Sequence, residues 1–400
     1  MLRHREYRLL CYGQTFSSMG GWMDEVTRGW LVYQLTDSVL QLGLVRGIQA
    51  VPFLLLSPVA GSFVDRHSRK KTLMVTQSLQ ALTMVIMAYL VLTGDIRIWH
   101  VYVIAALVAV MQVFQQPARG ALISDSVPRE FLTNAIGFNS LVFNVARTLG
   151  PALAGGLIVL WGTGGAYVVQ AVFIFLAVGW TSAMRAEAAA AGARGRAKER
   201  ESFTQSILEG WKFSWRNEAV RASLFCAMLV AFFVVPFTAM MPVFARDLLE
   251  VGASGQGLLL TCMGVGAFCS AALIALAGDR LPRGMFMFGS VVLYGILVVA
   301  FSASPWFALS LGLMFLAGIC QPLSNALVQT VIQSHAPVEL HGRTMALFSM
   351  HQVMITAGSV LLGSLAAALG PRWATAAMAA CGVISIILVM VAMPRARHIR

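Results

Sequence analysis

The sequence predicts an all-α membrane protein with twelve transmembrane helices in two pseudo-symmetric six-helix bundles. The chain of 400 residues is 58% hydrophobic and 12% charged, with a mean hydropathy of +0.76, whereas soluble domains carry about 25% charged residues. Apolar stretches of about 20 residues, long enough to cross a bilayer as a helix, recur along the whole chain. Motifs of the first half also return in the second half.

The apolar stretches end at turn residues or charges, which places the expected spans. Short connections such as "TGD" at 93–95 and "SASP" at 302–305 separate neighbouring stretches. The first stretch has no small-residue cleavage site, so we expect no cleavable signal peptide. The twelve predicted spans, called spans 1 to 12 in chain order, are residues 9–35, 39–60, 72–93, 98–118, 133–160, 164–184, 219–245, 255–277, 285–303, 305–330, 343–369 and 373–393.

The two halves share motifs at corresponding positions. Asp65-Arg66 follows span 2 and Asp279-Arg280 follows span 8, while "QPARGAL" at 116–122 corresponds to "QPLSNAL" at 321–327. Paired repeats with a substrate site near the middle of the membrane are typical of transporters. We therefore predict an N-terminal bundle at 1–184, a cytoplasmic linker at 185–218 and a C-terminal bundle at 219–400.

The basic residues indicate an orientation. Most of the 29 Lys and Arg residues lie on the side of both termini, and positively charged loops stay in the cytoplasm. We therefore expect both termini in the cytoplasm. The net charge of +12 is spread over short loops, which favours contact with anionic lipid headgroups over binding of nucleic acid.

Sequence motifs for enzymatic chemistry are missing. The six cysteines form no CxxC or Cys/His cluster, so neither a metal site nor a disulfide framework is indicated. The sequence contains no nucleotide-binding G-x-x-x-x-G-K-[ST] motif. We expect no enzyme activity, no ATP hydrolysis and no cofactor.

Charged residues interrupt span 1. At 100° per residue, Gln14, Ser18, Gly21, Glu25 and Arg28 share a face about 80° wide, with Asp24 at its edge beside Arg28. Ionisable residues at membrane depth usually mark a functional site. Arg147 in span 5 lies at the same depth as Asp24, ~22 Å along its span. The charges therefore form either a coupling site that faces a cavity or a permanent ion cluster between spans 1 and 5.

Further polar residues follow helical spacing in other spans. They either line a cavity or join helices through hydrogen bonds worth about 0.6 kcal/mol each, and the four-residue step in span 10 favours a cavity. Together with Trp22, Trp30 and Phe138, such a cavity suits an amphiphilic organic molecule of moderate size. The candidates are Gln112, Gln115 and Gln116 in span 4, Asn139 and Asn144 in span 5, Gln321, Asn325, Gln329 and Gln333 in span 10, and His351 and Gln352 in span 11.

The loop after span 2 resembles the G-x-x-x-D-R-x-G-R-[RK] signature of the major facilitator superfamily. The matching residues are Gly61, Asp65, Arg66, Arg69 and Lys70, and Ser68 stands where the family usually has Gly. The resemblance implies the major facilitator fold and a gate on the cytoplasmic side. Asp279, Arg280 and Arg283 are the counterparts in the second half. Without a gating role, the basic run is a topological anchor.

Span 5 is similar to the exporter signature of that superfamily, G-x8-G-x3-G-P-x2-G-G. Gly137, Gly150, Pro151 and Gly155 match it, and Ala146 and Ala154 replace two glycines. These small residues permit close helix packing, and Pro151 favours a bend. The segments "WLVYQLTDS" at 30–38 and "EGWKFSW" at 209–215 resemble the branch of enterobactin exporters and macrolide efflux pumps.

The linker contains a predicted interfacial helix. Its apolar residues fall on one helical stripe, as expected for an amphipathic helix on the inner leaflet; a partner-binding helix is the alternative. The stripe comprises Phe203, Ile207, Leu208, Trp211 and Trp215.

These features predict a secondary active exporter of a drug- or siderophore-like molecule, working by alternating access with the proton gradient as energy source. We expect a monomer in the bacterial cytoplasmic (inner) membrane. Glu25 is the coupling candidate because it shares the polar face, and Asp24 is the structural candidate because it lies beside Arg28. The alternatives are a passive or uptake carrier, a ligand-binding receptor or regulator without transport, and a lipid flippase.

Overall fold

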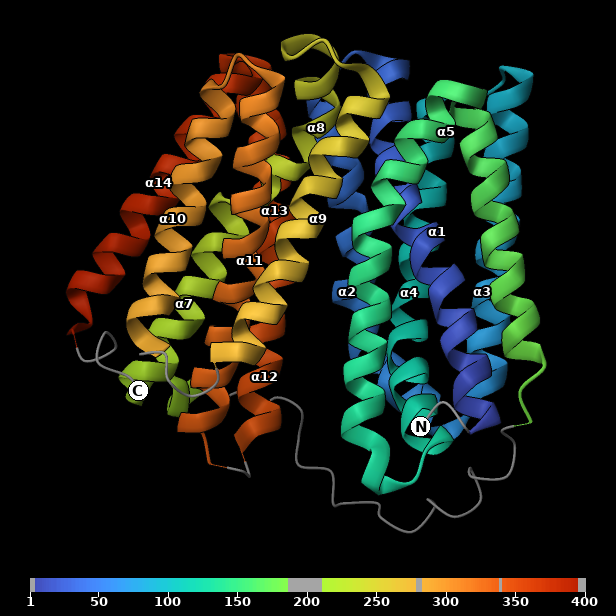
Figure 1. Cartoon of the computed structure of the whole chain (residues 1–400), viewed down its shortest axis with the longest axis horizontal. Coiled ribbons are helices and arrows are strands. Elements are labelled where there is room, and N and C mark those ends of the chain that lie inside the picture. The colour runs from blue at the N-terminus through green and yellow to red at the C-terminus, as the bar shows by residue number, and fades with distance from the viewer. Residues whose placement is uncertain (1–3, 186–210, 278–282, 338–339, 395–400) are drawn as a thin grey trace. The chain divides into compact units, whose positions relative to one another are not determined.

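The computed structural model describes residues 4–185, 211–277, 283–337 and 340–394, and these residues form helices joined by short turns (Figure 1). The predicted linker therefore lies mostly outside the described residues. The α-helices are α1 Arg5–Thr36, α2 Val39–Arg66, α3 Arg69–Thr93, α4 Ile98–Ser126, α5 Leu132–Ser182, α7 Glu218–Phe233, α8 Met241–Val243, α9 Gly252–Ala277, α10 Arg283–Ala303, α11 Phe307–His335, α12 His341–Ser349, α13 His351–Leu369 and α14 Pro371–Ala392.

The chain divides into two compact units with interleaved bounds. The first unit comprises Met1–Asp37, Gly47–Ala197 and Val251–Thr261, and the second comprises Ser38–Arg46, Lys198–Glu250 and Cys262–Arg400. Helices α2 and α9 thus contribute residues to both units. The predicted bundle boundaries at 184 and 219 stay a prediction.

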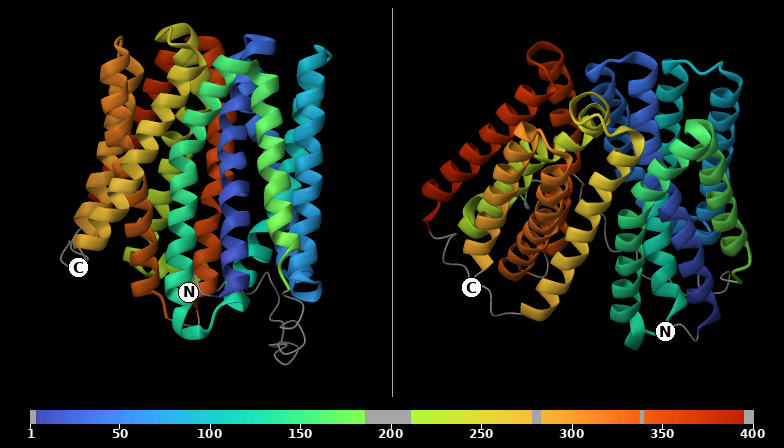
Figure 2. Two further views of the ribbon diagram at one scale, coloured as in Figure 1. Left: turned by 45° about the vertical axis from the view of Figure 1, so that its right-hand side comes forward. Right: turned by 45° about the horizontal axis from the view of Figure 1, so that its top comes forward.

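In the first unit, α1 packs along α5, and α3 packs against both α4 and α5. Figure 2 shows these helices from two further sides. Helix α5 contains two of the predicted spans, and the break between them is at Gly162, whose φ of 70° and ψ of 178° are not helical. A positive φ of this kind is readily adopted by glycine alone, so Gly162 supplies the reversal between the two helices.

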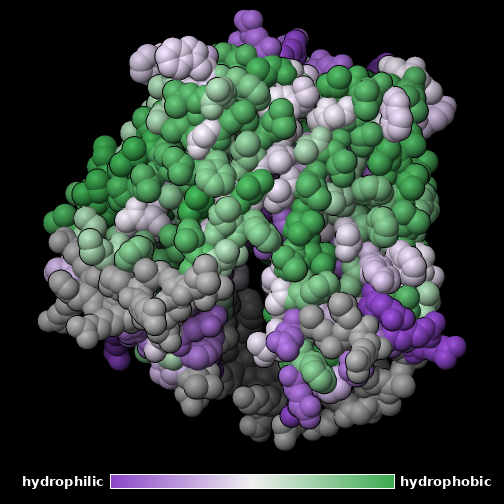
Figure 3. All heavy atoms as spheres, in the orientation of Figure 1, coloured by the Kyte–Doolittle hydropathy of each residue, from purple (hydrophilic) through white to green (hydrophobic). Residues whose placement is uncertain are grey.

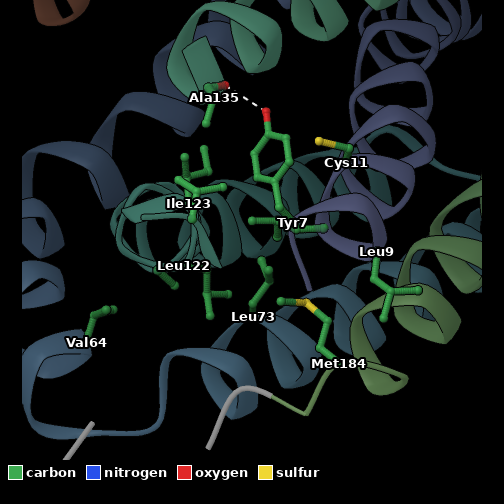
Figure 4. Close-up of a cluster of buried hydrophobic side chains, with 12 residues drawn as sticks. Tyr7, Leu9, Cys11, Val64, Leu73, Leu122, Ile123, Ala135 and Met184 are labelled. Atoms are coloured by element: carbon green, nitrogen blue, oxygen red, sulfur yellow. Dashed lines mark hydrogen bonds between the residues drawn. The ribbon is translucent and has the colours of Figure 1, made fainter. Parts of the chain in front are cut away.

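An apolar cluster closes one end of the first unit (Figure 4). Tyr7 is fully buried at its centre, and its hydroxyl donates a hydrogen bond of 2.8 Å to the backbone carbonyl of Ala135 at the start of α5. Leu73 of α3 and Leu122 of α4 pack in the same cluster. The cluster therefore ties the ends of α1, α3, α4 and α5 together.

In the second unit, α10 packs against α11 and α14, and α7 packs against α13 and α14. Two predicted spans are interrupted here. The span 219–245 ends as an α-helix at Phe233 and continues as a 3₁₀ turn, Val235–Met240, and a π turn, Phe244–Leu248. Pro236 and Pro242 lie in this region, and each lacks the N–H that a continuous helix needs. The span 343–369 is divided at Met350 into α12 and α13.

Ten of the helical segments in the described residues are long and apolar enough to cross a membrane. One of these, Arg129–Ser182, contains both helices on either side of Gly162, and α1 with its internal charges does not meet the criterion. Apolar side chains cover the middle of the helices and hydrophilic ones gather at their ends (Figure 3). The chain is therefore an integral membrane protein, while the number of twelve spans and the symmetry of two bundles stay predictions.

Candidate functional site

The centre of α1 carries a buried ion pair. Asp24 Oδ2 lies 3.1 Å from Arg28 Nη1, one helical turn further on, and the two residues are only 4% and 7% exposed. In the orientation that satisfies both ends of its amide, Gln49 of α2 accepts hydrogen bonds from Arg28 Nη1 and Nη2 at 3.0 and 2.9 Å. A guanidinium that is buried in this way is stabilised by both the carboxylate and the amide oxygen.

The second half of α5 contributes two polar residues next to this pair. Tyr167 is fully buried and interacts electrostatically with Asp24 and Arg28. Gln170, also fully buried, donates from Nε2 to the hydroxyl of Thr27 at 2.8 Å. The Tyr167 hydroxyl and Gln170 Oε1 have no hydrogen-bond partner among the described residues.

Glu25 and Arg147, the other two charged candidates, are less buried than the Asp24–Arg28 pair. Glu25 is partly exposed, in contrast to its neighbour Asp24. The Arg147 guanidinium carbon lies 5.6 Å from the centre of the Trp22 ring, and Trp22 in turn packs edge-on against Phe143. The cation therefore sits over the face of an aromatic ring of α1, an arrangement that stabilises it.

Helix α4 adds several polar residues, of which Arg119 was not predicted from the sequence. Gln115, a cavity candidate, donates to Gln80 Oε1 of α3 at 3.0 Å and is buried, which makes it an interhelical contact in this structure. Gln116 is exposed. Arg119 lies outside predicted span 4 yet inside α4, because the helix continues past Pro117, and its Nη2 donates to Ser17 of α1 at 3.1 Å.

The other polar candidates of the first unit point in several directions. Gln14 donates to Ser18 within α1 at 2.8 Å, and its Oε1 is buried without a partner among the described residues. Asn144 donates to the backbone carbonyl of Ser140 in its own helix. Asn139 is partly exposed.

The second unit brings three of its candidates together at one recess. Gln321 and Asn325 of α11 and His351 of α13 line it, together with Cys226 of α7 and Ser324. The recess encloses about 400 Å³ including its open side. The His351 ring Nδ1 lies 2.7 Å from the Phe348 carbonyl, which fixes the orientation of the ring. Gln329 lies one turn beyond Asn325 along α11 and is partly exposed.

Comparison with protein families decides the identity of the fold. The family of transmembrane secretion effectors, a family of the major facilitator superfamily, matches residues 1–398. The chain belongs to this family. It is therefore a transporter of the major facilitator type and not an enzyme.

Several characterised members of the superfamily are similar to the chain. The multidrug efflux pump Tap of Mycolicibacterium fortuitum is 24% identical over 98% of this chain and 96% of its own length. Macrolide efflux protein A of Streptococcus pyogenes is 20% identical over 87% and 86% of the two chains. The staphyloferrin A transporter of Staphylococcus aureus is 29% identical, but the match covers only 40% of this chain and 41% of that one.

Solved structures support the same fold. A bacterial homologue of the human lysosomal transporter Spinster superposes with a TM-score of 0.75 at 15% identity, covering 98% of both chains. The nucleoside transporter NupG superposes with a TM-score of 0.73 at 13% identity, over 96% of this chain and 98% of that one. At these identities the likeness concerns the fold alone.

The gate signature of the superfamily lies at the ends of α2 and α3. Asp65 is exposed in the last turn of α2, which ends at Arg66. Arg69 forms an ion pair with Asp125 of α4, and Lys70 donates to the backbone carbonyl of Met184. The sequence did not indicate Asp125 as a partner, because the pairing depends on how α3 and α4 pack.

The remaining signature residues of the loop have local roles or lie outside the described residues. Ser68 replaces the usual glycine, and its hydroxyl accepts from the Lys71 N–H, which caps the start of α3. Gly61 lies within α2 and has open space around it. Arg283 begins α10, whereas Asp279 and Arg280 lie outside the described residues.

The exporter signature residues all lie on α5. A Cβ at Gly150 would come within 2.7 Å of the Trp22 Cβ of α1, so the absence of a side chain permits this close approach. Gly155 packs equally closely on the backbone of Ala253 within the first unit. Pro151 is buried inside the helix, and Gly137 has open space around it.

Proposed function

We propose that the protein is a proton-coupled exporter that moves an amphiphilic organic molecule of moderate size by alternating access. The observation that carries the proposal is the arrangement of the two adjacent acids in α1. Asp24 is buried in an ion pair with Arg28, whereas Glu25 is partly exposed. This difference in burial supports a structural role for Asp24 and a proton-exchange role for Glu25.

Simple electrostatics supports the proposed proton coupling. A carboxylate near the middle of the membrane can take a proton from the outer side and release it on the inner side. Each proton that crosses a potential of 100 mV releases ~2.3 kcal/mol. The Trp22 and Phe143 rings supply an apolar wall for the substrate.

The direction of transport is inferred from two sources. The relatives Tap and macrolide efflux protein A are efflux pumps, and α5 carries the exporter signature residues Gly150, Pro151 and Gly155. The names of these two relatives suggest antibiotics and other drugs as substrate classes. The similarity to the staphyloferrin A transporter supports a siderophore as an alternative substrate of this protein.

Reconstituted protein tests this proposal. A thermal-shift screen of siderophores, macrolides, dyes and lysolipids first selects a ligand that binds. That ligand is then added outside proteoliposomes, and its uptake into the lumen is followed with and without an imposed pH gradient. An exporter accumulates ligand in inside-out vesicles that are acidic inside. Counterflow without any response to pH identifies a passive carrier, and ligand binding without counterflow identifies a receptor; either result contradicts the proposal.

A further inference from the structure

The recess of the second unit combines a few polar groups with an apolar wall. Its walls come from α7, α10, α11 and α13, and all of its lining residues belong to the second unit. The apolar lining consists of alanine, valine and isoleucine side chains. A small number of polar groups in an apolar pocket is typical of ligand sites. The polar groups and the one thiol come from Cys226, Gln321, Ser324, Asn325 and His351.

The recess has room for one end of a substrate rather than for a whole molecule of moderate size. The part of it that groups of the size of water can occupy measures about 40 Å³, which is about the space of three water molecules. A single polar group on a narrow chain fits this space. The body of the substrate would therefore stay on the open side of the recess.

His351 supplies a hydrogen-bond acceptor to the recess. Its ring Nδ1 lies 2.7 Å from the Phe348 carbonyl oxygen, and because a carbonyl oxygen only accepts, Nδ1 carries the proton of this contact. In the neutral ring the other nitrogen, Nε2, is then an acceptor. Nε2 forms no hydrogen bond among the described residues. It is therefore available to a group that donates.

Asn325 adds a side-chain amide to the same recess. It lies one turn beyond Gln321 on α11 and is exposed, and its amide forms no hydrogen bond with another described residue. The Ser324 hydroxyl, in contrast, donates to the backbone carbonyl of Gln321 at 2.7 Å. The Asn325 amide can therefore donate to a ligand that also reaches His351 Nε2.

The recess favours a neutral ligand group. The described residues that line it include no Asp, Glu, Lys or Arg. A charged group that leaves water is costly to bury unless an opposite charge pairs with it. Neither a carboxylate nor an ammonium group finds such a partner in the lining, so the recess selects a neutral polar group.

A hydroxyl group meets all of these requirements, because it is neutral, donates one hydrogen bond and also accepts. We propose that the substrate carries a hydroxyl on an apolar end, and that this hydroxyl binds in the recess, donating to His351 Nε2 and accepting from the Asn325 amide. The inference rests on the proposed function and names its substrate class, an amphiphilic alcohol with a neutral end. An ether only accepts, and would leave His351 Nε2 without a donor.

Three matched probes test the need for a donor on purified full-length protein in lipid nanodiscs. They are dansylaminohexanol, its methyl ether and dansylaminohexanoate, and the readout is dansyl fluorescence above that of empty nanodiscs. We expect saturable binding of the alcohol and about tenfold weaker binding of the ether, which leaves one acceptor without a donor. The carboxylate should bind more weakly than the alcohol. Equal affinities for alcohol and ether, a tighter carboxylate, or no saturable binding of the alcohol would overturn the proposal.

Variants separate the hydrogen bond from the shape of the recess. His351→Phe keeps a ring and removes the acceptor, so the alcohol should bind about tenfold more weakly, at the level of the ether, while the ether keeps its affinity. His335→Phe makes the same change at an exposed histidine that does not line the recess and should leave both affinities unchanged. If the preference for the alcohol survives in His351→Phe, it reflects the smaller size of the alcohol, and the proposal is wrong.

Asn325→Ala provides a test that does not depend on the folding of His351→Phe, because Asn325 is exposed. The variant should weaken the alcohol and the ether alike, by about fivefold, since the oxygen of either probe accepts from the Asn325 amide. Unchanged affinities would place the hydroxyl elsewhere and overturn the proposal. Transport enters none of these measurements, so failure of the alcohol site and failure of the exporter proposal are distinguishable.

Discussion

Replacement of Asp24 by asparagine tests the structural role of the ion pair in α1. The substitution keeps the size of the side chain and removes its charge, while Arg28 stays buried at 7% exposure. Loss of one member of a buried pair typically costs about 3–5 kcal/mol. Because the Gln49 amide oxygen still accepts two hydrogen bonds from Arg28, we expect the lower end, roughly 3 kcal/mol.

The loss can be measured as a shift in the melting temperature. If the first unit, which contains α1, melts cooperatively on its own, a conversion of roughly 2–4 °C per kcal/mol for its size predicts a shift of roughly 6–12 °C. Cys11 is a free, buried cysteine in the same helix, so a fluorogenic thiol reagent reports when α1 becomes accessible. A background with the other five cysteines replaced restricts the signal to Cys11.

A double-mutant cycle separates the ion pair from other effects of the substitution. Asp24→Asn with Arg28→Gln removes both charges and should be less destabilised than the sum of the single variants by about 2 kcal/mol. Asp247→Asn is the control, because it breaks an exposed pair with Arg246, where the expected loss is at most about 1 kcal/mol. If Asp24→Asn melts within about 1 °C of the unsubstituted protein, the structural assignment of Asp24 is wrong.

Three further outcomes are expected. Asp65→Asn should strongly slow turnover with ligand affinity unchanged, since it alters the gate signature; a normal rate of counterflow would remove the gating role. Gln321→Ala and Asn325→Ala should each weaken ligand binding about fivefold, as for loss of one hydrogen bond, with little change in melting temperature; reduced stability with full affinity would make them interhelical contacts. Gln115→Ala should show that opposite pattern, with about 0.6 kcal/mol of stability lost and ligand affinity retained, because Gln115 donates to Gln80.

The membrane class was predictable because hydropathy depends on composition alone. The positions where helices break were less predictable. The turn at Gly162 has a sequence signal in "WGTGG", and prolines mark the irregular stretch after Phe233. The division of the span 343–369 at Met350 carries neither a glycine nor a proline at that residue. Patterns in a single sequence therefore carry no signal for this break.

The candidate site was also only partly predictable from the sequence. Spacing along α1 placed Asp24 beside Arg28, because the two residues are one turn apart in the same helix. Gln49 and Gln170 were missed, although each is an amide inside an apolar span and that signal was present in the sequence. Their partners Arg28 and Thr27 come from another helix. Contacts between helices therefore required the three-dimensional structure.

Proton coupling through Glu25 is tested most directly by accumulation of ligand in inside-out proteoliposomes under an imposed pH gradient. Glu25→Gln keeps the shape of the side chain and cannot release a proton, while Glu130→Gln makes the same change at an exposed residue next to α5. The account predicts that Glu25→Gln abolishes accumulation against the gradient and preserves counterflow, and that Glu130→Gln retains both. If Glu25→Gln still concentrates the ligand, the coupling role of Glu25 is wrong.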